Sequence, residues 1–147
     1  MSVISDEYFQ LLLNKTSEYH GVNFYGQVVQ PGHSQLLNRA CLLFALECLL
    51  FQHRQTHATT WSPLTGREAL VHLIFQKYKW PLSEIRWLSL KDCVLLLQDE
   101  LRPENLSDEA AQITRNFGGN KKQHFPSLKD DEWDPELYLQ IPKQQNW

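Results

Sequence analysis

The chain has 147 residues, the usual size of one domain, and 42% of them are apolar, enough for a core that needs no disulfide or metal. Its net charge of -3 and its pI near 6.0 exclude a general attraction to nucleic acids or anionic membranes, although they leave room for a local basic patch. The three cysteines are an odd number, and the N-terminus lacks the basic start and apolar core of a secretory signal. We therefore expect a reduced, cytoplasmic protein.

The first predicted helix begins after Ser5 and ends near Gly21. Ser5 can accept a hydrogen bond from the first turn, two acidic residues follow it, and glycine accepts the left-handed backbone that ends helices. The next stretch, 22–29, has β-branched and aromatic residues but no helical stripe, and it leads to a Pro-Gly turn. It predicts an extended segment or a short strand.

The most apolar part of the chain is the run 40–51, in which Glu47 is the one charged residue. We expect Ser34 to cap a helix that continues to about residue 55. The twelve residues of this run fall short of the roughly 20 that span a bilayer, so the run predicts a buried core helix and no membrane span. A helix that is apolar on all sides must be covered on several of them, which predicts a helical bundle.

Four further helices are predicted after a break at residues 57–63. The first covers 65–79, where Thr65 and Glu68 match a capping box. Pro81 then starts a short helix that contains Ile85, Trp87 and Leu88. The pattern predicts one more helix at 89–101, capped by Ser89, and a last one at 107–116, capped by Ser107.

The composition changes at residue 118, from which acidic residues and prolines are frequent. We expect residues 1–117 to form a helical domain and residues 118–147 to form an extended, partly mobile tail. Apolar residues alternate with polar ones at 137–141, which predicts that this segment docks on the domain or on a partner. If it docks on the domain beside residues 22–29, the two segments would form a minor two-strand element. The predicted fold is mainly α, a compact bundle of five or six helices around the central helix at about 34–55.

Candidate groups for chemistry are few. His53 and His57 share a helix face, a spacing that helical zinc sites use, but the sequence shows no third ligand, so no metal or cofactor is predicted. Glu47 is either a buried carboxylate with a raised pKa, a structural ion pair or a point that meets solvent. The cysteines lie on apolar faces, where a thiol is unreactive. No catalytic constellation assembles, which favours a protein that is not an enzyme.

The main functional prediction is a non-enzymatic interaction or regulatory protein that binds another macromolecule, most simply another protein, with the oligomeric state left open. It depends on the number of aromatic residues, because tryptophan and tyrosine are enriched at binding surfaces. We expect ordinary packing for Trp80 and Trp87 in particular. The candidate partner-binding residues are Trp133, Tyr138 and Trp147.

Two alternatives stay open. Residues 65–102 predict a helix, a turn and two more helices, which resemble a helix-turn-helix nucleic-acid-binding regulator; its candidate contacts would be Lys77, Lys79, Arg86 and Lys91. Acidic residues beside these cations disfavour a groove-reading helix. The second alternative is a small enzyme with a site near Glu47, His53 and His57.

Overall fold

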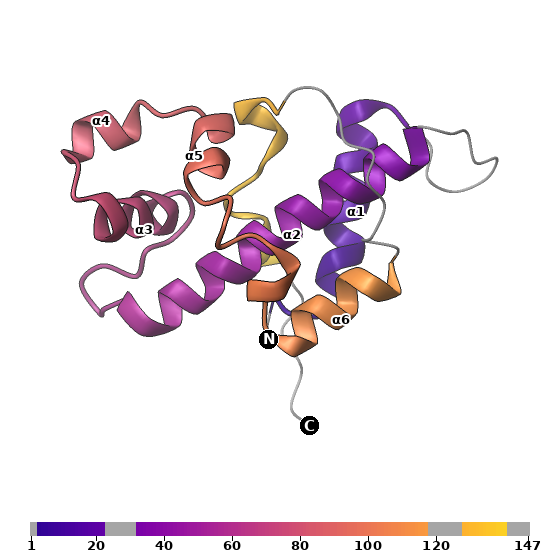
Figure 1. Cartoon of the computed structure of the whole chain (residues 1–147), viewed down its shortest axis with the longest axis horizontal. Coiled ribbons are helices and arrows are strands. Elements are labelled where there is room, and N and C mark those ends of the chain that lie inside the picture. Colours follow the sequence, from indigo (N-terminus) through magenta and orange to yellow (C-terminus); the bar gives the residue numbers. More distant parts are fainter. Residues whose placement is uncertain (1–2, 23–31, 118–127, 141–147) are drawn as a thin grey trace.

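A computed structural model describes residues 3–22, 32–117 and 128–140 of the chain (Figure 1). These residues form six α-helices and three short 3-10 helices, and no strand occurs among them, which confirms the predicted mainly α fold. The α-helices are α1 (Asp6–His20), α2 (Gly32–His57), α3 (Glu68–Tyr78), α4 (Leu82–Arg86), α5 (Leu90–Leu96) and α6 (Asp108–Asn116). The 3-10 helices are η1 (Pro103–Asn105), η2 (Asp130–Glu132) and η3 (Leu137–Gln140).

Helix α2 is the centre of the bundle. It runs diagonally through the molecule, with α1 and α6 at one end and α3, α4 and α5 at the other (Figure 1). Leu43, Phe44 and Leu50 of α2 are buried, and each such side chain contributes roughly 1.5 to 3 kcal/mol when it leaves water. The Phe9 ring of α1 lies 5.3 Å from the Phe44 ring and 4.4 Å from the Phe117 ring that follows α6. The predicted central helix is therefore confirmed.

Three predicted helix caps are present. The Ser5 hydroxyl accepts a hydrogen bond from the Tyr8 N–H at 3.2 Å, and the Ser89 and Ser107 hydroxyls cap α5 and α6 in the same way. Gly21 ends α1 with φ 65°, the left-handed conformation expected of it. Each hydroxyl cap contributes about 1 kcal/mol by satisfying a backbone donor that the helix leaves open.

Other helix ends differ from the predicted ones by a few residues. Helix α2 includes Gly32 and His57, so it extends beyond both ends of the predicted range and Ser34 lies inside it. Helix α5 ends at Leu96, before Leu101, and the residues between them form turns. Leu101 still reaches the core from that turn, which explains why its place in the apolar pattern suggested a longer helix.

The predicted capping box at the start of α3 does not form. Arg67, immediately before α3, has helical backbone angles and makes no side-chain cap. The Glu68 carboxylate forms an ion pair with Arg86 of α4 instead of turning back toward Thr65. A capping box contributes only a local hydrogen bond, so a tertiary partner of opposite charge can displace it.

The C-terminal part that the structure describes, residues 128–140, lies against α1 and α2, and we call it the docked segment (Figure 1). Its last four residues form η3, so the predicted extended segment at 137–141 is wrong for them. Residues 23–29 of the suggested two-strand element lie outside the described residues. Trp133 and Leu137 of the docked segment are 3% and 1% exposed and belong to the core. The division into a domain at 1–117 and a tail at 118–147 stays a prediction.

Helix α2 also includes the stretch Ser34–His57, which is long and apolar enough to cross a membrane by length and composition. Two thirds (67%) of its most apolar window is buried inside the fold. The core helix of a globular protein has the same properties. The predicted absence of a membrane span therefore stays a prediction.

Candidate functional site

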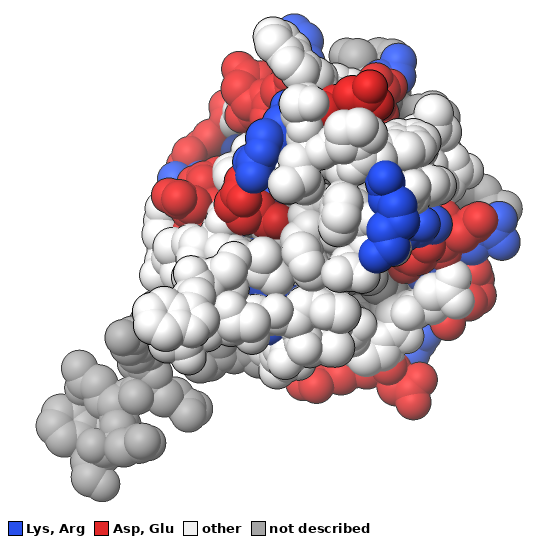
Figure 2. Space-filling model, turned by 90° about the vertical axis from the view of Figure 1, so that its left-hand side faces the viewer, with Lys and Arg blue, Asp and Glu red and all other residues white. Residues whose placement is uncertain are grey.

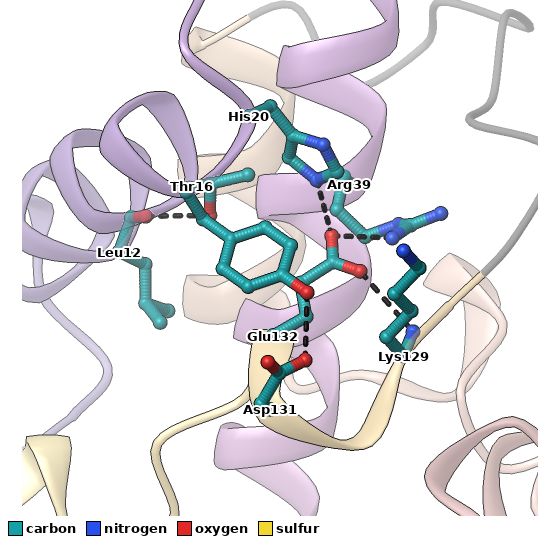
Figure 3. Close-up of polar contacts among 8 residues, drawn as sticks. Leu12, Thr16, His20, Arg39, Lys129, Asp131 and Glu132 are labelled. Carbon is teal, nitrogen blue, oxygen red and sulfur yellow. Dashed lines mark hydrogen bonds and ion pairs between the residues drawn. The ribbon is translucent and has the colours of Figure 1, made fainter.

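Glu132 anchors the docked segment to both long helices. Its carboxylate accepts a hydrogen bond from Arg39 of α2 and forms another with the His20 ring of α1 (Figure 3). The second carboxylate oxygen accepts from the Lys129 N–H at 3.4 Å. The side chains of Arg39 and Glu132 are only 4% and 1% exposed, so their ion pair is almost free of solvent. A pair of this kind fixes a position well, because either charge left alone would be strongly unfavourable.

Two further acidic residues of the docked segment accept hydrogen bonds from the helices on either side of it. The Tyr19 hydroxyl of α1 donates to the Asp131 carboxylate at 2.6 Å (Figure 3). The Leu90 N–H at the start of α5 donates to the Asp130 carboxylate, also at 2.6 Å. Backbone N–H groups at a helix start favour negative charge, so Asp130 suits this place. The acids that predicted a solvated tail instead join α1, α2 and α5.

Trp133 and Glu47 form a buried polar contact. The indole N–H of Trp133 donates to Oε1 of Glu47 at 2.6 Å, and the Glu47 residue is 0% exposed. Burial raises the pKa of Glu47 to about 7, although the Trp133 hydrogen bond and the Arg54 charge oppose this. The neighbouring Tyr8 hydroxyl lies close enough to Glu47 to lower its pKa as well, and neither it nor the second Glu47 oxygen has another hydrogen-bond partner in the described part of the chain. Glu47 is thus a buried carboxylate in a closed core position.

Arg54 and Tyr138 attach the C-terminal end of the docked segment to the loop before α3. The Arg54 guanidinium donates to the carbonyls of Leu64 and Gly66, at 2.8 and 3.0 Å. It lies 4.1 Å from the centre of the Tyr138 ring, and the Tyr138 hydroxyl accepts from the Gly66 N–H at 3.4 Å. Leu64 and Gly66 have φ values of 56° and 62°, so these contacts hold a loop with unusual backbone angles. Tyr138 is therefore engaged within its own chain.

These contacts change the meaning of the predicted partner-binding residues. Trp133 is a core residue and Tyr138 is half-buried beneath an arginine, so Trp133 is not the surface aromatic that the sequence suggested. The Trp133 indole takes the place of water beside Glu47. No local sequence pattern could indicate that these two residues are partners. Trp147 lies outside the described residues.

Two of the exposed aromatic residues, Trp80 and Trp87, are those for which ordinary packing was expected. Trp87 is 89% exposed, Trp80 is 38% exposed and the neighbouring Leu82 is 46% exposed. We call Trp80, Leu82 and Trp87, which lie at the α3–α4 end of the molecule, the aromatic corner. Figure 2 turns this end toward the viewer and shows a broad uncharged area bordered by both basic and acidic side chains. Trp61, in the loop before α3, is 94% exposed.

The aromatic corner sits on well-held elements. Ile85 anchors α4 in the core at 1% exposure, and Arg86 of the same helix pairs with Glu68 of α3. The Arg67 guanidinium donates to the Leu88 carbonyl at 2.8 Å, which fixes the chain directly after Trp87. Helix α4 has only five residues, and Ile85 is the one among them whose side chain is buried in the core. The neighbouring Trp87 is left to point outward.

Tyr78 connects the corner to α5. Its hydroxyl donates to the Leu96 carbonyl at 3.0 Å, and its ring stacks on the Trp80 ring with centroids 4.9 Å apart. Trp80 therefore has a fixed face against the protein and an open face toward solvent. Lys79 joins these two residues with a left-handed backbone, φ 59°, which turns the chain sharply between α3 and α4.

The four candidate nucleic-acid contacts do not form one free basic patch. Lys77 pairs with Glu100, and Arg86 pairs with Glu68. Lys79 donates to the Gln76 side chain at 3.2 Å, and Lys91 is exposed on α5. Two of the four cations are thus neutralised by acids of the same chain, which weakens their attraction to phosphates.

Three histidines meet where α2 packs on α3. The rings of His53 and His57, from the end of α2, have centroids 4.5 Å apart. The His72 ring of α3 lies 5.0 Å from the first and 5.5 Å from the second. Nε2 of His53 and Nδ1 of His72 are 2.8 Å apart, a hydrogen bond. His72 is not recognisable from the sequence as a neighbour of His53 and His57, because only the packing of α3 on α2 brings it to the other two.

Burial makes the cysteines poor nucleophiles. Cys41, Cys48 and Cys93 are free thiols, and the last two are fully buried. Loss of solvent raises the pKa of Cys41 and of Cys48 to about 12. A thiol in such surroundings behaves as a small apolar side chain.

Comparisons with known proteins add no further constraint. No protein-family model matches the sequence, and searches of curated proteins and of solved structures found no significant match. Functional inference therefore rests on the contacts and exposures of this chain alone.

Proposed function

We propose that this protein is a non-enzymatic interaction protein that binds another protein through the aromatic corner, Trp80, Leu82 and Trp87. The observation that carries the proposal is the 89% exposure of Trp87 on a helix that Ile85 and the Arg86–Glu68 pair hold in place. Tryptophan is the residue type most enriched among those that dominate binding energy at protein interfaces. A large apolar side chain fixed in water favours a complex in which it becomes buried.

Rigidity of the corner supports a binding role. Ordering a flexible side chain or loop on binding reduces affinity, whereas a surface that is already ordered avoids that loss. The Tyr78–Trp80 stack and the Arg67–Leu88 hydrogen bond order both ends of the corner before any partner arrives. We therefore expect the partner to present an apolar pocket that admits the Trp87 indole, with few charges at its centre.

The charges near the corner favour a protein over a nucleic acid. Arg86 is paired with Glu68 and Lys77 with Glu100, which leaves Lys79, hydrogen-bonded to Gln76, as the cation next to Trp80 that no acid of the described residues neutralises. A protein that stacks single-stranded bases on aromatic rings also needs a positive groove for the backbone. We propose a cytoplasmic location, and the three unpaired cysteines support it.

The test compares two exposed apolar residues in different places. The full-length chain, Trp87→Ala and Leu139→Ala are each used to capture proteins from a lysate of the source cells, and captured proteins are then purified for calorimetric titration. Leu139, on the docked segment, is 59% exposed and serves as the matched control. We expect Trp87→Ala to weaken binding at least about tenfold, equivalent to about 1.4 kcal/mol, and Leu139→Ala to leave it unchanged.

Two results would overturn the proposal. One is a purified partner that Trp87→Ala and the unchanged chain bind equally well. The other is binding of single-stranded DNA that Trp87→Ala abolishes and that weakens steeply with salt, which would assign the corner to nucleic acids. Light scattering of the purified chain over a range of concentrations separates self-association from capture of a different protein. Deleting residues 118–147 would not serve as a test, because that change removes Trp133 from the core.

A further inference from the structure

We propose that His53, His57 and His72 together bind one divalent transition-metal ion of the zinc class, which joins the end of α2 to α3. The three ring centroids are separated by 4.5, 5.0 and 5.5 Å. Imidazoles that bind one tetrahedral zinc through nitrogens at about 2.0 to 2.1 Å have centroids roughly 5 Å apart. The backbone of two helices thus already places three rings at the spacing that such a site requires.

A small rotation of the rings separates the present arrangement from a coordinated one. As the rings lie, no group of three His, Cys, Asp or Glu side chains in the described residues surrounds a common metal position. Nε2 of His53 and Nδ1 of His72 are 2.8 Å apart because they share a proton in a hydrogen bond. Two nitrogens on one tetrahedral zinc lie roughly 3.3 Å apart. To admit the ion, the His53 and His72 rings would each have to turn until their nitrogens point at a common metal position, and the two nitrogens would move about 0.5 Å apart.

Binding would replace the hydrogen bond between His53 and His72 by two metal bonds. The proton now held between the two nitrogens moves to the other nitrogen of the donating ring, so each ring offers one lone pair to the metal and stays neutral. Two neutral imidazoles therefore lose no net proton. Burial lowers the pKa of His53 to about 4 and lowers that of His72 as well, so both rings are in the ligand form at neutral pH.

The surroundings define what kind of ion the site would take. Besides the neighbouring histidines, Arg54 acts on His53 and Lys79 acts on His72, and no carboxylate among the described residues contributes to either pKa. Three neutral nitrogen ligands favour zinc, copper or nickel over calcium and magnesium, which prefer oxygen. His57 is exposed, so water can occupy a fourth position. The Gln76 amide lies 3.4 Å from Nε2 of His72 and can hold that ring in place.

The proposal is independent of the aromatic corner, because none of the three histidines belongs to it. The metal would fasten α3 to α2, and α3 carries the Tyr78 and Glu68 side chains that order the corner. Loss of the metal site would leave Trp87 exposed, and loss of Trp87 would leave the three rings unchanged. The two proposals can therefore fail separately.

The experiment titrates zinc chloride into the full-length chain, free of any histidine tag, by calorimetry. His57→Ala and His72→Ala each remove one proposed ligand, and His124→Ala is the control for unspecific binding by a histidine outside the described residues. We expect one zinc ion per chain, an affinity at least about tenfold lower in each of the first two variants, and a change below roughly twofold in the control.

A second measurement reports coordination directly. Cobalt(II) chloride absorbs visible light strongly when it is held tetrahedrally, and this absorption should appear with the unchanged chain and His124→Ala but not with His57→Ala. Because zinc binds the folded state, it should also raise the midpoint of thermal unfolding of the unchanged chain and of His124→Ala, but not that of His57→Ala. The proposal fails if the double variant His57→Ala/His72→Ala retains stoichiometric zinc binding, or if the unchanged chain binds zinc no better than that variant does.

Discussion

Two regions of this molecule hold tryptophans in opposite surroundings. In the docked segment, Trp133 is 3% exposed and its indole N–H bonds to a buried carboxylate. At the aromatic corner, Trp87 is 89% exposed although Ile85, two residues earlier, is buried. The comparison shows that the surroundings of an aromatic residue in space decide whether it stabilises the fold or remains available to a partner. The acidic, proline-rich composition around Trp133 suggests exposure, and the helical pattern around Trp87 suggests burial.

The largest expected effect separates the two tryptophans by stability. Trp133→Ala should lower the free energy of unfolding by about 3 to 5 kcal/mol, because it opens a cavity and leaves the Glu47 carboxylate without its donor. Trp87→Ala should change it by less than about 0.5 kcal/mol, because the side chain loses few contacts. Urea unfolding of both variants at pH 7 measures the difference.

A further variant divides the Trp133 effect into its parts. Trp133→Phe keeps most of the ring but removes the indole N–H, so its loss of about 1 to 3 kcal/mol reports the hydrogen bond to Glu47. Similar unfolding free energies for Trp133→Ala and Trp87→Ala would contradict the contrast between the regions. That result would place the indole of Trp133 outside the core.

The next effect compares one ion pair from each region. Arg39→Met should destabilise the chain by about 3 kcal/mol, because it leaves the Glu132 carboxylate buried with its arginine partner removed. Arg86→Met breaks the pair with Glu68, whose two side chains are 49% and 52% exposed, and should cost less than about 1 kcal/mol. Chemical unfolding of both variants in low and high salt is the measurement. A salt-sensitive loss for Arg39→Met, equal to that for Arg86→Met, would show that the Glu132 pair is solvated.

The sequence predicts those features of the fold that depend on neighbouring residues. Hydroxyl caps at Ser5, Ser89 and Ser107 are confirmed, and so is the burial of the central helix, because each depends on a pattern within a few positions. The Thr65 capping box is not formed, because Glu68 has a stronger partner on α4. The end of α5 is misplaced, because a turn can present Leu101 to the core as well as a helix can.

Candidate site residues are predicted less well, since they depend on contacts between distant parts of the chain. His53 and His57 are visible as a pair with helical spacing, but His72 joins them only through the packing of α3 on α2. Glu47 is recognisable as an odd charge in an apolar run, whereas its donor Trp133 is 86 residues away. For Trp87, the short length of α4 is the one local signal of exposure, because a five-residue helix can bury few side chains.

The smallest of the three effects concerns Glu47, and it depends on pH. Its pKa is 4.5 in the unfolded reference and about 7 in the folded chain, so between these pH values the folded chain binds more protons than the unfolded chain. The free energy of unfolding therefore contains a contribution that falls as the pH rises from 4.5 to 7 and stays low above that range. Glu47→Gln keeps the acceptor for the Trp133 indole and removes the ionisable proton.

At pH 8, Glu47→Gln should be more stable than the unchanged chain by about 1 to 3 kcal/mol, and the difference should vanish toward acidic pH. His53 shifts stability in the opposite direction, since its lowered pKa makes the folded chain bind fewer protons between pH 6.5 and about 4. That contribution is common to both proteins and cancels in their difference. Urea unfolding at several pH values gives the comparison, with Glu84→Gln on exposed α4 as the matched control. A difference that is independent of pH would mean that Glu47 ionises in the folded chain as readily as in the unfolded chain, and that water reaches the contact with Trp133.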